Sequence, residues 1–466
     1  MSLRAPSAGQ SLPPRPLPVA DGTETFRVET WGCQMNVLDG QRMAGQLEAL
    51  GLTRAAEAEP ARVVLLNTCS VREKAESKVF SELGVLARRK QEDPDLVIGV
   101  TGCVAQVSGE EILERAPFVD FVAGTGQVER IGELVAAARR DRRQALAVEL
   151  PSDDPVYQFR EISRESPFQA YVTIIEGCDQ FCTFCIVPFT RGRERSRSAS
   201  EIAAEVEALC RSGYTEVTLL GQTVNAYRDS EEGFGLGELL RRVARTEGLR
   251  RLRFLTSHPR LVDDALLDAL AGVPSVSGYL HLPAQSGSDR VLSRMKRRYT
   301  GNEYREIVAG IRARCPEIAL SSDFIVGFPG ETDSDFEDTL ALVADVRFAS
   351  LFGFRYSPRP GTASARWGRD SEVPDEVAAE RLRRLLDLQT GIQRSVNASL
   401  VGRRFEILID GVSRRGQPTG RTSCNRIVHV EESGPIAPGT YLDVVVTKGL
   451  PNSLLGRLVS RGGPSW

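Results

Sequence analysis

The feature of this sequence that most constrains its fold is a regular alternation of short apolar, β-branched runs with helical stretches. This alternation predicts parallel β-sheets covered by helices, because neighbouring parallel strands need a long crossover connection, usually a helix. Three runs precede residue 150: FRVETWGC, RVVLLNTCS and LVIGVTGCV. Six more lie between residues 165 and 390: AYVTII, EVTLL, RLRFL, GYLHL, LSSDFIVGF and SLFGFRY.

The runs divide the chain into three blocks. Residues 23–150 are predicted to form an open parallel α/β domain, and residues 165–392 a (βα)6 barrel or partial barrel. Residues 393–461 hold short strand candidates broken by Gly and Pro, which predict a small β-barrel: RFEILID, GRTSCNRIVHV and TYLDVVVTKGL. The Pro- and Ser-rich residues 1–22 are predicted to be a disordered tail, and residues 151–164 a linker.

Two helices expected in the central block carry start signals. Ser198 and Glu201 have the spacing of a capping box, and so do Thr300 and Glu303. Apolar residues at helical spacing follow the second pair, which predicts an amphipathic helix there: Tyr304, Ile307, Val308 and Ile311.

Composition is that of an ordinary globular protein. Charged residues make up 26% and hydrophobic residues 41% of the 466 residues. No apolar run approaches the roughly 20 residues of a membrane helix, and the start lacks the apolar region of a signal peptide. We therefore expect a cytoplasmic protein. Thiols stay reduced in the cytoplasm, so the nine cysteines indicate metal or redox chemistry rather than disulfides.

Charge is unevenly distributed along the chain. Residues 393–466 contain ten Lys or Arg and five Asp or Glu, a local charge of +5, although the whole chain carries −3. A basic C-terminal module on an acidic body is typical of a protein that binds a polyanion at that end. The alternative is a chance surplus of charge on a solvated face.

Three cysteines, Cys178, Cys182 and Cys185, lie close together directly after the first strand expected in the central block. Cysteine thiolates are the usual ligands of a [4Fe–4S] cluster, and three of them leave one iron open for chemistry. The alternatives are a zinc site or incidental cysteines. Apolar neighbours are predicted to form a dry wall around the site: Phe181, Phe184, Ile186 and Val187.

A second trio, Cys33, Cys69 and Cys103, is spaced 36 and 34 residues apart. Each cysteine follows one of the three N-terminal strand candidates. If those strands are parallel neighbours, the three thiols meet at one edge of the sheet, where open α/β sheets place ligands. Small neighbours such as Gly32 and Gly102 would let a bulky cluster approach the backbone. The alternative is three buried structural cysteines.

These motifs together resemble the methylthiotransferases, a radical S-adenosylmethionine family with a second iron–sulfur cluster. The resemblance covers about residues 25 to 460. The N-terminal motifs are WGCQMNVLDGQRM, LNTCSVREKAESKVF and TGCVAQ. The central motifs are EGCDQFCTFCIVPFTRGRERSR, LLGQTVNAY, HLPAQSGSDRVLSRMKRRYT and SSDFIVGFPGETDSDFEDTL. GRTSCNRIVHV is similar to the RNA-binding TRAM module.

The resemblance implies an activity: methylthiolation at C2 of a prenylated adenosine, N6-dimethylallyladenosine, at position 37 of tRNA. It implies two [4Fe–4S] clusters, one on each cysteine trio, with the six cysteines as catalytic residues and metal ligands. S-adenosylmethionine would bind the open iron of the central cluster, and a second S-adenosylmethionine would supply the methyl group. A purine C2–H is neither acidic nor nucleophilic, so a radical route is needed.

The expected partners are the anticodon stem-loop of tRNA and a flavodoxin-type reductant, with the protein a monomer. Three alternatives remain at this point. Two lie within the family: methylthiolation of threonylcarbamoyladenosine in tRNA, or of a ribosomal protein. The third is a non-catalytic RNA-binding protein that carries zinc or a cluster.

Four polar residues at or just after strand ends are candidates to line the barrel mouth and bind cofactor or base: Gln222, Ser257, Gln285 and Asp323. Each is as well explained as a loop-capping group. Four arginines follow the cysteine loop and are candidates to contact the cofactor carboxylate or RNA phosphates, Arg191 first among them for the cofactor. The alternative is a solvated basic loop for all four: Arg191, Arg193, Arg195 and Arg197.

The remaining histidines and cysteines near predicted elements are expected to be structural. His258 and His281 are predicted to be satisfied polar groups of the core rather than metal ligands. Cys210 and Cys315 are predicted to be packing residues of helices. Cys424 is placed inside a C-terminal strand and receives no role.

Overall fold

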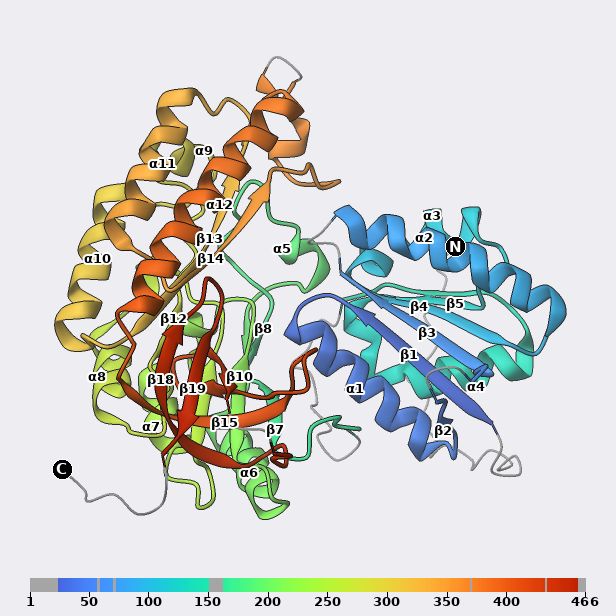
Figure 1. The fold of residues 1–466 in the computed structure, drawn as a ribbon. Coiled ribbons are helices and arrows are strands. Elements are labelled where there is room, and N and C mark those ends of the chain that lie inside the picture. The colour runs from blue at the N-terminus through green and yellow to red at the C-terminus, as the bar shows by residue number, and fades with distance from the viewer. Residues whose placement is uncertain are drawn as a thin grey trace. The chain divides into compact units, whose positions relative to one another are not determined.

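The computed structural model describes residues 24–56, 59–69, 73–150, 162–368, 371–431 and 434–459 (Figure 1). The tail predicted for residues 1–22 and most of the predicted linker lie outside the described residues. Within them, the chain forms two compact units, of which the first ends at Ser163 and the second begins at Arg164. The central block and the C-terminal block thus belong to one unit.

The first unit contains a six-stranded, all-parallel sheet with the strand order β2-β1-β3-β4-β5-β6. The three runs predicted from the sequence form β1 (Thr25–Trp31), β3 (Val63–Thr68) and β4 (Val97–Gly102). Both β3 and β4 are buried throughout, as expected for central strands of a parallel sheet. The sequence prediction missed three short strands: β2 (Thr53–Arg54), β5 (Phe121–Ala123) and β6 (Ala145–Ala147).

Helices cover both faces of this sheet, and β3 shows how. Leu65 belongs to one hydrophobic cluster with residues of α1 and α4, whereas Leu66 belongs to another with residues of α2 and α3. Successive side chains of a strand point to opposite faces, so the unit has three layers, as the predicted α/β class requires. The helices are α1 (Gln34–Ala49), α2 (Glu73–Glu92), α3 (Cys103–Arg115) and α4 (Ile131–Asp141), with a 3-10 helix, η1 (Thr125–Arg130).

In the second unit, all six predicted runs form strands of a partial barrel. They make two parallel three-stranded sheets, β7-β10-β11 and β12-β13-β14, and an isolated parallel bridge between Leu252 and Val276 connects β11 to the segment before β12. One hydrophobic core takes residues from all six. The strands are β7 (Gln169–Thr173), β10 (Glu216–Leu220), β11 (Arg251–Phe254), β12 (Tyr279–His281), β13 (Ala319–Val326) and β14 (Ser350–Arg355).

Helices alternate with these strands and start largely where the sequence predicts. Thr300 and Glu303 form a complete capping box. Ser198 accepts a hydrogen bond from the N–H of Glu201, but the Glu201 carboxylate lies 3.9 Å from Arg197 rather than closing the box. The helices are α5 (Val187–Thr190), α6 (Ala199–Arg211), α7 (Leu236–Val243), α8 (Asp264–Gly272), α9 (Asp289–Arg294), α10 (Gly301–Arg314), α11 (Asp333–Val346) and α12 (Asp375–Ala398), with 3-10 helices η3 (Val224–Ala226), η4 (Pro259–Leu261) and η5 (Ser364–Arg366).

The C-terminal strands close into a five-stranded barrel with the order β15-β16-β17-β19-β18, which confirms the predicted fold. The sequence GRTSCNRIVHV is not one strand, because it turns at Asn425, whose φ is +64°. Cys424 therefore lies in a turn, and β19 was missed. The strands are β15 (Arg404–Val412), β16 (Pro418–Thr422), β17 (Ile427–Val430), β18 (Tyr441–Gly449) and β19 (Leu454–Leu458).

The two parts of the second unit are joined by α12 and by a polar interface. The predicted boundary at residue 392 falls inside α12, which is drawn in orange and leads into the red strands in Figure 1. Arg253 of β11 pairs with Glu216 at 3.1 Å and donates hydrogen bonds to the carbonyl oxygens of Thr422 and Ser423. The C-terminal barrel is thus bound to the end of the partial barrel where β10 and β11 begin.

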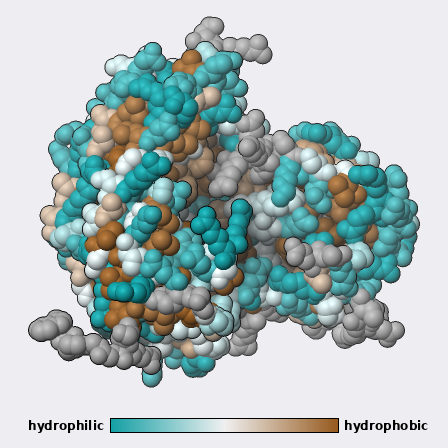
Figure 2. Space-filling model, viewed as in Figure 1, coloured by the Kyte–Doolittle hydropathy of each residue, from teal (hydrophilic) through white to brown (hydrophobic). Residues whose placement is uncertain are grey.

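No helix in the described part of the chain is long and apolar enough to cross a membrane. Hydrophilic residues cover much of the face shown in Figure 2, with hydrophobic residues between them.

Candidate active site

The cysteine loop of the second unit is closed at its base. It leaves β7 through β8 (Ile175–Glu176) and returns through β9 (Arg195–Ser196), and these two short strands pair antiparallel. Next to this pair, the N–H of Cys178 donates to the carbonyl oxygen of Gly192 at 3.1 Å, and the N–H of Asp179 donates to the Glu194 carboxylate at 3.0 Å. The loop therefore extends from the carboxyl end of β7, and the strand pair and hydrogen bonds at its base hold its two ends together, so we call it a pinned loop.

Gly177 makes the close approach at the base possible. Its φ is +80°, and a Cβ atom there would collide with the carbonyl oxygen of Arg193. Only glycine satisfies both requirements. Farther along the loop, the Thr183 hydroxyl donates to the carbonyl oxygen of Arg294 at 2.9 Å, which holds the loop against the C-terminal end of α9.

The three thiols of this loop lie in a dry environment. Cys178 and Cys182 are buried, and Cys185 is half-buried. Burial raises the pKa of the Cys185 thiol to about 12, and the neighbouring Cys182 and Cys178 thiols contribute to the increase. Burial also raises the pKa of Cys178. Without a metal these two thiols are protonated at neutral pH, so a metal that binds them displaces protons.

A [4Fe–4S] cluster and a single metal ion require different placements of three thiols. Among the described residues, no three Cys, His, Asp or Glu side chains converge so that they could hold one ion. In a cubane cluster each thiolate binds a different iron, so the ligands surround a volume rather than a point. The dry wall expected around the loop is incomplete, because Phe181 is 41% exposed, although Ile186 is buried.

The structure places Cys33, Cys69 and Cys103 at the carboxyl ends of three neighbouring parallel strands. The last residues of β1, β3 and β4 are in register, and each cysteine follows within two residues. A Cβ on Gly32 would lie 2.8 Å from the Cβ of Cys69, so these strand ends approach closely. Cys69 and Cys103 are buried, but Cys33 is exposed, which argues against three buried structural cysteines.

The four polar candidates at the barrel mouth differ in what they contact. Gln222 accepts a hydrogen bond from the N–H of Gly177 at 2.5 Å, so it supports the base of the cysteine loop. Ser257 is 3% exposed, and its hydroxyl has no hydrogen-bond partner within the described residues. Gln285 is half-buried with φ of +72°. Asp323 lies inside β13 rather than after it and approaches His281 at 3.4 Å.

The four arginines after the cysteines do not act as one group. Arg197 is buried and pairs with Glu205 at 2.7 Å, and Arg195 approaches Glu176 at 3.7 Å, so both are structural rather than solvated. Arg191 is 5% exposed beside the loop. Arg193 alone has a largely exposed side chain, which pairs with Asp179 at 2.9 Å and lies over the Phe181 ring.

The other predicted structural residues lie in packed or bonded positions. His258 is buried, and its backbone exchanges hydrogen bonds with the Asn225 side chain. His281 hydrogen-bonds Ser321 at 2.8 Å. Cys315 is buried at the end of α10, and Cys210 lies near the end of α6. The placements agree with the sequence prediction for these residues.

Sequence reasoning missed the residues that contact the cysteines. The Thr223 hydroxyl lies 3.4 Å from the Cys178 sulfur, and a guanidinium nitrogen of Arg297 lies 3.5 Å from the Cys182 sulfur. Arg297 belongs to the basic run KRR within RMKRRYT, but nothing in that run indicates which side chain turns inward.

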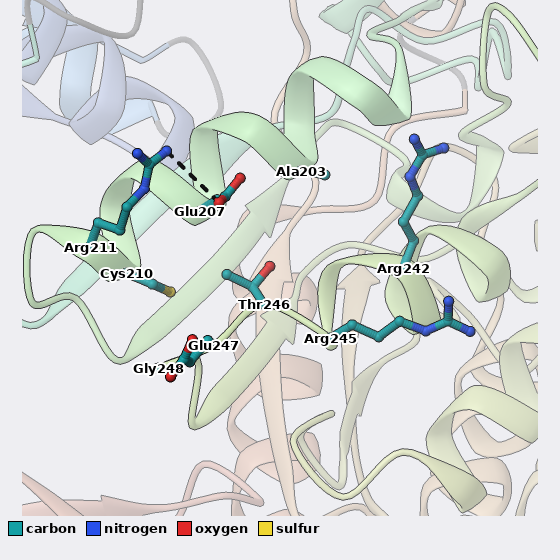
Figure 3. Close-up of a pocket in the computed structure, with 9 residues that line it drawn as sticks. All are labelled: Ala203, Glu207, Cys210, Arg211, Arg242, Arg245, Thr246, Glu247 and Gly248. Atoms are coloured by element: carbon teal, nitrogen blue, oxygen red, sulfur yellow. Dashed lines mark ion pairs between the residues drawn. The ribbon is translucent and has the colours of Figure 1, made fainter.

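A surface pocket of about 560 Å³ lies elsewhere on the partial barrel (Figure 3). It is lined by α6, by the end of α7 and by the segment between α7 and β11, including Cys210 and Gly248. The Arg211–Glu207 ion pair lines one wall at 4.0 Å. These residues precede the strands β10 and β11, whereas the cysteine loop follows β7, so the pocket is separate from the candidate site.

Comparison with known proteins agrees with this architecture. Three family models match: Uncharacterized protein family UPF0004 over residues 25–124, Radical SAM superfamily over residues 172–343 and TRAM domain over residues 398–459. Among solved structures, the radical S-adenosylmethionine methyltransferase TsrM from Kitasatospora setae has a TM-score of 0.54 at 16% identity. The match covers 73% of this chain and 74% of TsrM, and it shows similarity of fold.

The matches and the cysteine loop define a radical SAM protein with a C-terminal TRAM domain. A tRNA-2-methylthio-N(6)-dimethylallyladenosine synthase from Cereibacter sphaeroides is 46% identical over 433 residues, 93% of this chain and 98% of the relative. Another of that name from Acidithiobacillus ferrooxidans is 47% identical over 441 residues, 93% of this chain and 97% of the relative. The chain belongs to the tRNA-2-methylthio-N(6)-dimethylallyladenosine synthase family. Membership of the radical SAM superfamily implies S-adenosylmethionine and a [4Fe–4S] cluster as cofactors.

Proposed function

We propose that this chain converts N6-dimethylallyladenosine at position 37 of tRNA to its 2-methylthio derivative. The observation that carries the proposal is the pinned loop after β7, which holds the buried Cys178 and Cys182 close enough to the half-buried Cys185 to raise the pKa of its thiol. Similarity to relatives of that name over more than nine-tenths of the chain supports the choice of substrate.

In this proposal the six cysteines hold two [4Fe–4S] clusters. One cluster lies in each unit, on Cys178, Cys182 and Cys185 in the second and on Cys33, Cys69 and Cys103 in the first. When bound, the clusters and S-adenosylmethionine supply one-electron reduction, hydrogen abstraction, sulfur and a methyl group, which an unreactive purine C2–H requires.

The chain's own residues position these groups. Gln222 holds the base of the loop through the N–H of Gly177. We assign Ser257 to cofactor binding because its buried hydroxyl lacks a partner within the described residues. We also assign Arg191 and Gln285 to cofactor binding. Arg191 is buried beside the loop, and Gln285 is half-buried after β12.

RNA would bind through exposed cations, aromatic rings and the TRAM domain. Arg193 is exposed beside the loop, and Phe189 in α5 is 53% exposed. Unpaired bases stack on exposed aromatic rings, and phosphates bind arginines, so affinity should fall steeply with salt. We therefore propose the anticodon stem-loop as the part of tRNA that is bound.

The proposal extends to domain roles and setting. Residues 23–150 would carry the second cluster, residues 165–392 the radical chemistry and residues 393–461 the RNA contacts.

We propose that the protein is a monomer in the reducing cytoplasm and receives electrons from a flavodoxin-type reductant. Size-exclusion chromatography with light scattering tests the monomer, and turnover with reduced flavodoxin in place of dithionite tests the donor.

The decisive experiment is anaerobic incubation of the reconstituted protein with dithionite, S-adenosylmethionine and prenylated tRNA. Mass spectrometry of the digested nucleosides should reveal 5′-deoxyadenosine and the 2-methylthio nucleoside. A Cys185→Ala variant should form neither, whereas a Cys210→Ala variant should form both. Full activity of Cys185→Ala, or no product from the iron-loaded protein, would contradict the proposal.

The three alternatives are tested in the same assay. Replacing the prenylated tRNA by threonylcarbamoyladenosine-containing tRNA, or by ribosomal proteins, should give no methylthio product. A zinc-bearing RNA binder would contain zinc rather than iron and would never release 5′-deoxyadenosine.

A further inference from the structure

Arg297 is a buried cation in an unusual setting. It lies in the turn between α9 and α10, where Lys296 and Arg298 both have positive φ values, +59° each. These conformations are uncommon for residues with a side chain. Lys296 and Arg298 are exposed, while Arg297 is only 6% exposed. The strained turn thus directs one of three successive basic side chains into the protein.

The guanidinium of Arg297 is held at three points. Its Nε donates to the Tyr299 hydroxyl at 3.0 Å, and one terminal nitrogen donates to the carbonyl oxygen of Pro283 at 2.9 Å. The other terminal nitrogen lies 3.5 Å from the sulfur of Cys182. The planar group is therefore fixed in orientation, with one edge toward a proposed cluster ligand.

What Arg297 lacks is a carboxylate partner within the described residues. Other buried arginines have one: Arg197 pairs with Glu205 at 2.7 Å and Arg381 with Glu331 at 2.9 Å. A buried charge without a counter-charge is costly, and a guanidinium does not lose its proton in a protein. Of the groups that the Arg297 guanidinium contacts, only the Cys182 thiol becomes negatively charged when it binds a metal.

We propose that Arg297 is a positioning residue that raises the reduction potential of the cluster on Cys178, Cys182 and Cys185. The inference rests on the cluster assignment in the proposed function. Three thiolates on a [4Fe–4S] core leave a net negative charge, and one electron from an external reductant makes it more negative without forming or breaking a bond. A nearby fixed cation stabilises the reduced form more than the oxidised form.

The test isolates this cluster in the full-length chain. Cys33, Cys69 and Cys103 are replaced by Ala, so that only the barrel site binds iron. Arg297→Gln, Arg297→Lys and Arg298→Gln are then compared by anaerobic redox titration monitored by electron paramagnetic resonance, with iron and sulfide analysis of each sample. Arg298 is the matched control, because it is the exposed neighbour with the same charge.

We expect Arg297→Gln to lower the ratio of reduced to oxidised cluster at least tenfold at the wild-type midpoint, about 59 mV for one electron. Arg297→Lys keeps the charge and should stay within threefold of wild type, and Arg298→Gln should be unchanged. If Arg297→Gln keeps the wild-type potential, or if Arg298→Gln shifts it equally, the inference is wrong.

Loss of the cluster from Arg297→Gln is also informative. The charge explanation then requires Arg297→Lys to retain iron, whereas equal loss in both variants would mean that the guanidinium acts only through packing and would overturn the inference. If the parent protein with three Cys→Ala changes binds no iron, the cluster assignment itself fails. That result differs from the case in which the parent protein binds iron but its reduction potential does not change when Arg297 is replaced.

Discussion

At the scale of single residues, Gly177 is a position where the cysteine loop does not tolerate a larger side chain. Gly177→Ala should destabilise the second unit by about 1 to 3 kcal/mol, because the new Cβ meets the Arg193 carbonyl oxygen and φ is positive. Iron bound by the loop should fall in parallel. Gly213→Ala is the control, since Gly213 also has positive φ but its Cβ would meet nothing within 4 Å. Iron analysis and urea unfolding measure both effects, and equal iron loss in the control would exclude the steric explanation.

His258 gives a residue-scale prediction about pH. Burial, followed by the charge of Arg297, lowers the pKa of His258 to about 3, from about 6.5 in an unfolded chain. Its stabilising effect is therefore complete above pH 6.5 and is lost as the pH falls toward 3, because only the unfolded chain gains the proton. The free energy of unfolding of metal-free wild type should fall more steeply than that of His258→Gln, by about 1.4 kcal/mol per pH unit between pH 6 and 4. Parallel slopes in urea titrations would contradict this.

Residues of the candidate site could be predicted from the sequence only where the chemistry requires a particular spacing between candidate ligands along the chain. The placement of the six candidate cysteines could be predicted, because they follow strand-like runs in the sequence. Arg297 and Thr223 could not, because their contacts with the cysteines join segments far apart in the chain. The four arginines that follow the cysteines were treated as one group in the sequence, but the structure buries Arg197 and exposes the side chain of Arg193.

At the scale of elements, α5 offers a test of RNA binding. Phe189→Ala should weaken binding of a prenylated anticodon stem-loop about tenfold, since loss of a base–aromatic stack costs about 1 to 3 kcal/mol. The iron content and melting temperature should not change, because the ring is 53% exposed. Leu386→Ala on α12, also an exposed apolar residue, is the control. Fluorescence anisotropy measures the affinity, and equal affinities for wild type and Phe189→Ala would exclude α5 from the interface.

Strands and helices were predictable where the hydrophobic pattern of a run and its length indicate the same secondary structure. All nine strand runs named before residue 360 form strands, and eight of the nine span four or more residues. Strands of two or three residues, such as β2 and β6, have too few positions to establish a period. The turn between β16 and β17 was missed because Asn425 rather than glycine adopts the positive φ.

At the scale of the whole molecule, the interface between the partial barrel and the C-terminal barrel should contribute strongly to stability. Arg253→Ala should lower the free energy of unfolding by about 3 kcal/mol, because it leaves Glu216 and two carbonyl oxygens without that donor. Arg415→Ala, on the exposed surface of the C-terminal barrel, should change the free energy of unfolding by less than about 0.5 kcal/mol. Calorimetry of both variants tests this. No difference between them would mean that the interface contributes little. Sequence could not reveal this interface, since it joins β11 to residues about 170 positions later.

The two cysteine trios differ in when each can first exist during synthesis. Cys178, Cys182 and Cys185 span eight residues of one loop, so a growing chain presents all three almost at once. Cys33, Cys69 and Cys103 become neighbours only after β1, β3 and β4 have aligned side by side. If the trios hold the clusters as proposed, iron delivered to a nascent or partly denatured chain has one site ready, and the other forms only once the N-terminal sheet has formed.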